Sequence, residues 1–169
     1  QMEKQLRGLA KQIPVNVNDL NRYGEAAGQL GIKKENIVSF VRTIADLGVT
    51  TNLVGEEGAQ SLARFANIIG MSQGNFQRLG STIVELGNQG ASTEKEIMDM
   101  ALRLAGAGKV IGLTEAQTLG FANALSSVGI EAEAGGSAFS KMFIELASAG
   151  GKKLEAFCKV AHMTGSQFK

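Results

Sequence analysis

The chain of 169 residues is long enough to bury a core as a single domain. Its 17 Lys and Arg nearly balance its 16 Asp and Glu, so no net field would recruit nucleic acid or an anionic membrane. One cysteine and one histidine exclude an internal disulfide and every metal site built on several cysteines or two histidines.

The chain is rich in glycine, with 22 in all, and contains three similar stretches at 30–48, 69–87 and 111–129. Each begins with an aliphatic residue and a glycine, continues with a short polar start, and closes on a glycine after an amphipathic segment. Apolar residues recur there at i, i+3, i+4 and i+7, which predicts a helix that buries one stripe. Another helical pattern precedes each stretch, so the predicted unit is a helical hairpin repeated about every forty residues.

In chain order, the hairpins are predicted near 18–48, 56–87 and 93–129, followed by helices at 135–149 and 152–161. The polar start MTGSQF at 163–168 matches MSQGNF at 71–76. We therefore expect a further copy of the repeated helix to begin there, in a parent chain that continues. The predicted fold is all-α: residues 1–169 form one helical domain, a fragment of a longer chain, whose hairpins build a multi-helix bundle or a short solenoid.

Glycines and hydroxyl side chains mark the expected turns and helix starts. A glycine after a helix can adopt the left-handed conformation without the steric penalty that other residues meet. Ser and Thr at a helix start can accept bonds from free backbone N–H groups, and a Gln three residues later completes a capping box. Thr114 with Gln117 and Thr164 with Gln167 have that spacing. The predicted turn glycines are Gly31, Gly48, Gly70, Gly87, Gly112 and Gly129, and the predicted caps are Ser72, Thr114 and Thr164.

The sequence offers no pattern typical of a catalytic, metal or cofactor site. Cys158 and His162 lie four residues apart and could share a helix face, but Cys158 falls on an apolar stripe, where a free cysteine acts as a small hydrophobe. The segment AGAGKVIG at 105–112 departs from a phosphate-binding loop because Val110 replaces the Ser or Thr and no strand precedes it. We predict no catalytic residue, no metal ligand and no cofactor.

Nucleic acid and membrane partners are also disfavoured. Two helices joined by a glycine turn are the core of a DNA-reading motif, but the predicted helix over 114–128 has no basic residue to contact phosphates. No apolar run approaches the ~18 residues that a membrane span needs. We predict neither specific nucleic-acid binding nor a membrane span in this segment.

The order of segments resembles one protein family. The run ALSSVGIEAEAGGSAFSKMFIELA at 124–147 closely resembles the conserved core of phage tail tape measure proteins, in which a helix ends in SVG, an acidic link follows, and GGSAF opens the next helix. The segment FCKVAHMTGSQF at 157–168 looks like the continuation of that core. The similarity runs from about residue 37 to the end and rests on the ordered succession, not on a short motif.

This resemblance implies a structural, non-enzymatic role in the tail of a phage or prophage. The long chain would lie in the lumen of the tail tube while tube subunits polymerise around it, so that its extent sets the tail length, and would leave ahead of the genome. The implied partners are tail tube subunits, tail assembly chaperones and tail tip proteins, with self-association as a further option. The implied site of synthesis is the cytoplasm of the bacterial host.

Three other interpretations stay open at this point. The hairpins could form a scaffold that binds a peptide or protein; Cys158 and His162 could line an enzyme pocket; and exposed apolar stripes could engage a membrane during genome delivery. Gly80 and Gly120 lie inside predicted helices, where each glycine costs about 1 kcal/mol relative to alanine. The sequence therefore suggests a marginally stable assembly that opens during tail assembly or ejection.

Overall fold

A computed structural model describes residues 2–149, 151–164 and 166, and within them the chain is all-α, without strands. The helical pattern and the many turn glycines of the sequence account for this architecture. The helices are α1 (Met2–Leu9), α2 (Val17–Gln29), α3 (Lys34–Thr50), α4 (Gly55–Ile69), the 3-10 helix η1 (Gln73–Asn75), α5 (Phe76–Gln89), α6 (Glu94–Val110), α7 (Glu115–Ser127), α8 (Ala132–Ala147) and α9 (Gly151–Val160).

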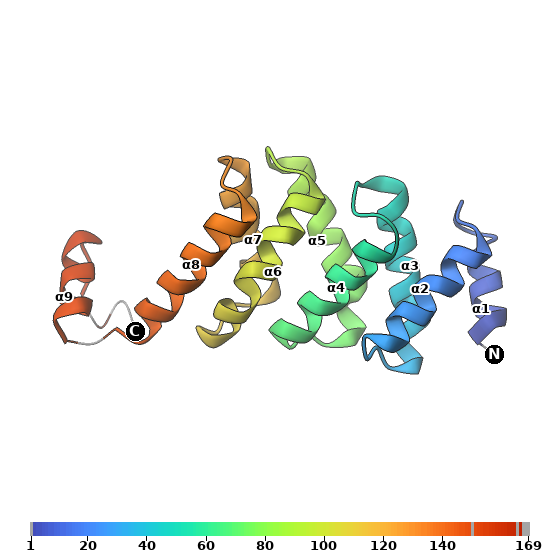
Figure 1. The fold of residues 1–169 in the computed structure, drawn as a ribbon, viewed down its shortest axis with the longest axis horizontal. Coiled ribbons are helices and arrows are strands. Elements are labelled where there is room, and N and C mark those ends of the chain that lie inside the picture. Colours follow the sequence, from blue (N-terminus) through green and yellow to red (C-terminus); the bar gives the residue numbers. More distant parts are fainter. Residues whose placement is uncertain (1, 150, 165, 167–169) are drawn as a thin grey trace.

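The helices α1 to α8 stand in a row as two layers (Figure 1). The even layer contains α2, α4, α6 and α8, and the odd layer contains α1, α3, α5 and α7. Within each layer a helix packs on its predecessor and successor, and the most extensive pairing joins α6 to α8. Stacking of this kind, in which each unit meets only its neighbours, is a short solenoid.

The first helix, α1, is an element that the hairpin repeat did not predict. Leu6 and Leu9 of α1 are buried, and α1 packs against both α2 and α3. Its other described side chains are mostly exposed and polar, as expected of an element that closes one end of a solenoid. The periodicity missed α1 because the helix is short and stands outside the repeat.

Two of the predicted turn glycines are wrong. Gly48 lies inside α3, which continues to Thr50, and Gly87 lies inside α5, which continues to Gln89. The end of α3 is fixed by Thr51, whose hydroxyl donates to the Leu47 carbonyl oxygen at 2.8 Å and accepts from the Leu53 N–H at 3.0 Å. A side chain thus satisfies the helix end, and no left-handed glycine is needed there.

One continuous core runs between the two layers. Its central aromatic contact joins Phe40 of α3 to Phe76 of α5, with ring centroids 4.7 Å apart in an edge-to-face arrangement. Both rings are completely buried. The other large side chains of the core that are shielded from solvent are Leu20, Ile44, Leu62, Phe65, Ile83, Ile97, Met98, Met100, Leu104 and Leu119.

Gly80 allows close packing between α3 and α5. A Cβ atom at Gly80 would lie 2.8 Å from the Cγ2 atom of Thr43, closer than such atoms approach. The Thr43 hydroxyl donates to the Ser39 carbonyl oxygen at 3.1 Å, which holds this methyl group in place. Gly120 of α7, by contrast, has no atom within 4 Å of the position of an added Cβ. The two interior glycines, which the sequence suggested as equivalent weak points, therefore differ in their surroundings.

This difference predicts opposite effects of alanine at the two positions. We expect Gly120→Ala to raise the free energy of unfolding by up to about 1 kcal/mol, because a helical glycine loses more backbone entropy than alanine. We expect Gly80→Ala to lower the free energy of unfolding by about 1–2 kcal/mol, because the new methyl group overpacks the helix contact. Urea midpoints of the two variants measure both effects.

The matched control for Gly80→Ala is the double variant with Thr43→Ser. Serine removes the obstructing methyl group and keeps the hydroxyl that bonds Ser39. We expect the double variant to recover most of the stability that Gly80→Ala loses. A rise in stability with Gly80→Ala alone would contradict the close-packing explanation.

Candidate functional site

The hairpin turns are shaped by glycines with positive φ. Gly31, Gly70, Gly112 and Gly129 have φ between 78° and 81°, the region that favours glycine. In each case the next residue donates its N–H to a carbonyl oxygen in the last turn of the helix; at Gly112 this bond joins Leu113 N to Gly108 O at 2.8 Å. Each of these bonds satisfies a carbonyl oxygen at the end of its helix, and the left-handed glycine turns the chain toward the next helix.

The predicted caps have different outcomes. The Thr114 hydroxyl accepts from the Gln117 N–H, and the Gln117 side chain accepts from the Thr114 N–H at 3.0 Å, which completes a capping box at the start of α7. Ser72 is wrong as a side-chain cap, because a 3-10 turn intervenes before α5 and the Ser72 side chain makes no cap bond. The Thr164 hydroxyl bonds to that of Ser166, whereas Gln167, its expected partner, lies outside the described residues.

A second capping box, at the start of α6, was not among the predicted caps. The Glu96 carboxylate accepts from the Thr93 N–H at 2.8 Å and from the Thr93 hydroxyl at 2.9 Å. The Thr93 hydroxyl in turn accepts from the Glu96 N–H. The bond from the Thr93 backbone N–H, followed by the bond from the Thr93 hydroxyl, lowers the pKa of the Glu96 carboxyl. The Thr-x-x-Glu spacing is the signal that identifies such a box in a sequence.

The lowered pKa of Glu96 predicts an acid-sensitive contribution to stability. A carboxyl whose pKa is lower in the folded state stabilises the fold above its unfolded pKa, and that contribution is lost as pH falls through the folded pKa. We expect Glu96→Gln to remove this dependence, since Gln117 forms the equivalent box of α7. The difference in urea midpoint between wild type and variant should shrink on acidification, and a constant difference would contradict the assignment.

Polar side chains tie neighbouring hairpins together at their turns. The Gln73 side-chain oxygen accepts from the Lys33 N–H at 2.8 Å, and its amide nitrogen donates to the Gly31 carbonyl oxygen at 3.0 Å. At the opposite ends of the helices, the Ser92 hydroxyl bonds to the Asn123 side-chain oxygen at 2.7 Å. These contacts fix the register of one hairpin on the next, and the sequence contained no periodic signal for them.

Exposed ion pairs cross the even layer. Arg22 of α2 pairs with Glu56 of α4 at 3.4 Å, Lys95 of α6 pairs with Glu57 of α4 at 2.6 Å, and Arg103 of α6 pairs with Glu133 of α8 at 3.3 Å. The hydrogen bond to Glu57 raises the pKa of Lys95. Because all these side chains are at least 42% exposed, each pair contributes little to stability, and their main effect is to align the helices.

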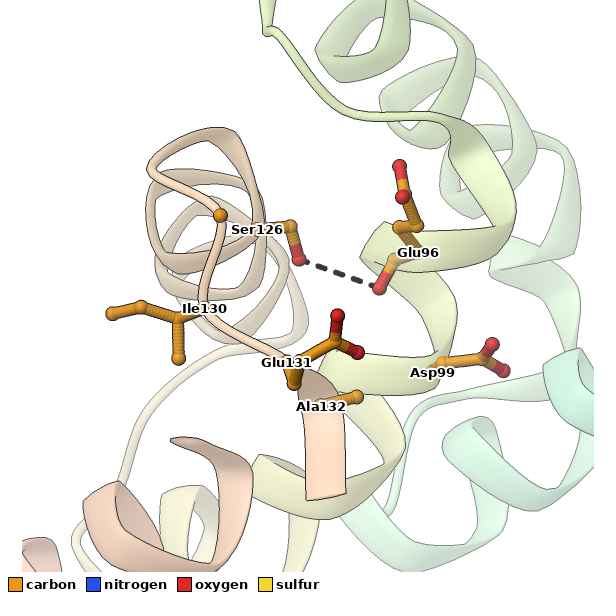
Figure 2. A pocket seen from close by; sticks show the side chains of 7 residues that line it. Glu96, Asp99, Ser126, Ile130, Glu131 and Ala132 are labelled. Atoms are coloured by element: carbon orange, nitrogen blue, oxygen red, sulfur yellow. Dashed lines mark hydrogen bonds between the residues drawn. The ribbon is translucent and has the colours of Figure 1, made fainter. Parts of the chain in front are cut away.

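A partly enclosed hollow lies between α6 and the connection from α7 to α8 (Figure 2). It measures about 140 Å³, and Glu96, Asp99 and Glu131 are among the residues that line it. The Ser126 hydroxyl closes one side by donating to the Glu96 carbonyl oxygen at 3.4 Å. Among the described residues no group of His, Cys, Asp or Glu has the arrangement of a metal site, and the Glu96 carboxylate is already engaged by Thr93.

Apolar and polar side chains share a larger groove between α3 and α5 on the odd layer. It measures about 320 Å³, and Leu47, Gly80 and Val84 supply its apolar part. Asp46 and Glu85 stand among its polar lining residues. A groove of this composition can accommodate a side chain or a short segment of a partner.

Cys158 lies in the last turn of α9, and His162 lies two residues after the helix ends. Cys158 is buried, with 6% of its surface exposed. His162 follows the helix with φ of 53°, in the left-handed region that the turn glycines occupy elsewhere. The described part of the chain also has no helix with the length and apolarity required to cross a bilayer.

Comparison with known proteins gives one finding. The model of a family described as phage-related minor tail protein matches residues 3–168, nearly the whole chain. Searches of curated proteins and of solved structures returned no match.

Proposed function

Because this chain belongs to the phage-related minor tail protein family, we propose that it is a segment of a tape measure protein. In this role it contributes to the length of the phage tail, takes part in assembly of the tail tube, and leaves with genome delivery. Family membership supports a structural component of the virion tail, and the resemblance of residues 124–147 to the tape measure core supports the more specific role.

The linear stacking of hairpins is the observation that carries this proposal. In the described part of the chain the extensive contacts of each hairpin are with the preceding and following hairpins, so adding or removing one would change the length of the array and leave the rest intact. A chain with this organisation can vary in length by whole units. A helix also advances about 1.5 Å per residue, so a helical chain along a tube axis is a regular spacer.

The proposed partners follow from this role. Tail tube subunits would surround the parent chain in the tube lumen, and tail assembly chaperones and tail tip proteins would meet it before and at the end of polymerisation. The near balance of charge in the chain favours recognition by shape over attraction by a net field. We assign this segment no enzymatic activity. Cys158 is buried and contributes to packing, and the Glu96 carboxylate is bonded to Thr93 and caps α6.

A genetic experiment tests the length function. We expect in-frame duplication of residues 55–93, one hairpin with its connection, to lengthen the tail by at most about 60 Å, the span of roughly forty helical residues. Electron microscopy of tails from the phage that encodes the chain measures the change. Tails of unchanged length would overturn the ruler role, and an unduplicated phage carrying Gly106→Ala controls for general effects of alteration.

The groove between α3 and α5 favours a second candidate function, a helical scaffold that binds a protein or peptide. Its apolar floor and acidic rim suit a segment with an apolar side chain next to a basic one. A scaffold would bind its partner through this groove without affecting tail length. Val84→Lys should then abolish binding of purified tube subunits in size-exclusion chromatography, while the tails keep their length.

A further inference from the structure

The helix α8 stands at the end of the even layer, and within the part of the chain that the structure describes its only extensive packing is against α6. Met142 of α8 occupies the position that corresponds to Phe65 of α4. Each of the two lies seven residues after a glycine that packs against the loop before its helix, Gly135 in α8 and Gly58 in α4. Phe65 is completely buried, because α4 lies between α2 and α6. Met142 is 40% exposed. The row thus ends with an uncovered apolar flank on α8.

The residues that form this flank follow one edge of α8. Ala138, Met142 and Leu146 have i, i+4 and i+8 spacing and lie beside the edge that packs on α6. The covered edge is defined by Gly136, whose added Cβ would meet Arg103 of α6. A helix placed against this flank would continue the even layer by one position.

The helix α9 has the terminal structure of the even helices α2, α4 and α6. His162 occupies the left-handed position that Gly31, Gly70 and Gly112 occupy after those helices. The Met163 N–H donates to the Cys158 carbonyl oxygen at 3.0 Å, the counterpart of the bonds Ile32 to Ala27, Met71 to Ala66 and Leu113 to Gly108.

The apolar stripe of α9 is also in register with those helices. Four residues before the turn position, the even helices have Ala27, Ala66 or Gly108, all small and buried, and α9 has Cys158. Eight residues before it, α4 and α6 have the buried Leu62 and Leu104, and α9 has Leu154. In α4 and α6 this stripe faces the interior of the stack, whereas α9 stands apart from α8 (Figure 1).

We propose that α9 is a strap that closes onto the free flank of α8 and becomes the next helix of the even layer. Closure places the half-buried Leu154 against the exposed Met142, so that apolar surface on both helices leaves water together. Cys158, which is already buried, lies one turn further along the same stripe and faces Leu146. Gly151, the first residue of α9, has φ of 52°, a conformation suited to a change of chain direction. This proposal is independent of the role in tail length.

Disulfide trapping with the single native cysteine tests the closure. Cys158 is the only cysteine of the chain, so Met142→Cys or Leu146→Cys creates one defined pair. A disulfide requires the two Cα atoms to come within about 7 Å, so α9 must lie beside α8 for the pair to form. Mild oxidation of the full chain, followed by non-reducing electrophoresis and intact mass, measures formation of the internal disulfide.

We expect at least one of the two variants to form a monomeric internal disulfide at least about tenfold faster than the control Ile144→Cys, because a docked pair has a high effective concentration. Ile144 is exposed on α8 and lies two residues from both Met142 and Leu146, on the opposite side of the helix, so the control retains a similar sequence separation. Adding Cys158→Ser to the reactive variant should remove the product. Equal rates in all three variants would overturn the proposal. A predominantly dimeric product would do so as well, since α9 would then dock on a second copy.

Discussion

Replacement of Phe76 by alanine is expected to lower the free energy of unfolding by about 3–5 kcal/mol, the usual cost of deleting a buried phenylalanine. The Phe76 ring is fully buried at the start of α5 and meets Phe40 of α3 edge to face, with ring centroids 4.7 Å apart. Removing it leaves a cavity between two helices of the odd layer, at the centre of the core. Urea unfolding followed by circular dichroism measures the loss.

Phe121→Ala is the matched control for this cavity. Phe121 of α7 has the same edge-to-face relation to Phe143, with centroids 5.3 Å apart, but its ring is 43% exposed. We expect this variant to lose about 1 kcal/mol, since less apolar surface returns to water and the site stays open to solvent. Similar losses in the two variants would mean that Phe76 does not anchor the core.

Gly136→Ala is expected to destabilise the protein by about 2–3 kcal/mol through separation of α8 from α6. An added Cβ would lie 2.4 Å from the Cβ of Arg103. Both atoms are bonded directly to the backbone, so no rotation of a side chain can relieve the contact, and a helix must move. Amide hydrogen exchange should show the loss of protection in α8 together with the lower urea midpoint.

The control for this variant is Gly106→Ala in α6. Gly106 is also inside a helix, but no atom lies within 4 Å of an added Cβ. We expect it to gain up to about 1 kcal/mol from the higher helix propensity of alanine. If Gly136→Ala were as stable as Gly106→Ala, the close approach of α6 and α8 would not depend on the missing side chain.

Most of the helices are predictable because their cause is local. The apolar stripes and the Thr114–Gln117 spacing depend on residues three or four apart, which a single sequence displays. The left-handed turns at Gly31, Gly70 and Gly112 follow from the repeat in the same way. The all-α fold class and the order of the hairpins therefore follow from short-range patterns.

The contacts between hairpins are not predictable because their cause is distant in the chain. Gly80 is a weak helix position by its local context, and its packing role depends on Thr43, which belongs to another hairpin. Gly48 and Gly87 resemble turn residues because a glycine near a helix end looks the same whether the helix stops before or after it. The bonds of Gln73 and Asn123 likewise join residues that no short pattern connects.

The row of hairpins also determines how the molecule would respond to a pulling force. Because the extensive contacts among the described helices join adjacent units, traction on one terminus would detach the outermost hairpin while the next remained in place. The rupture would then advance stepwise along the row, and each step would release a similar length of slack chain. Such an object can be drawn through a narrow passage piece by piece, without the simultaneous collapse that a single globular body would require.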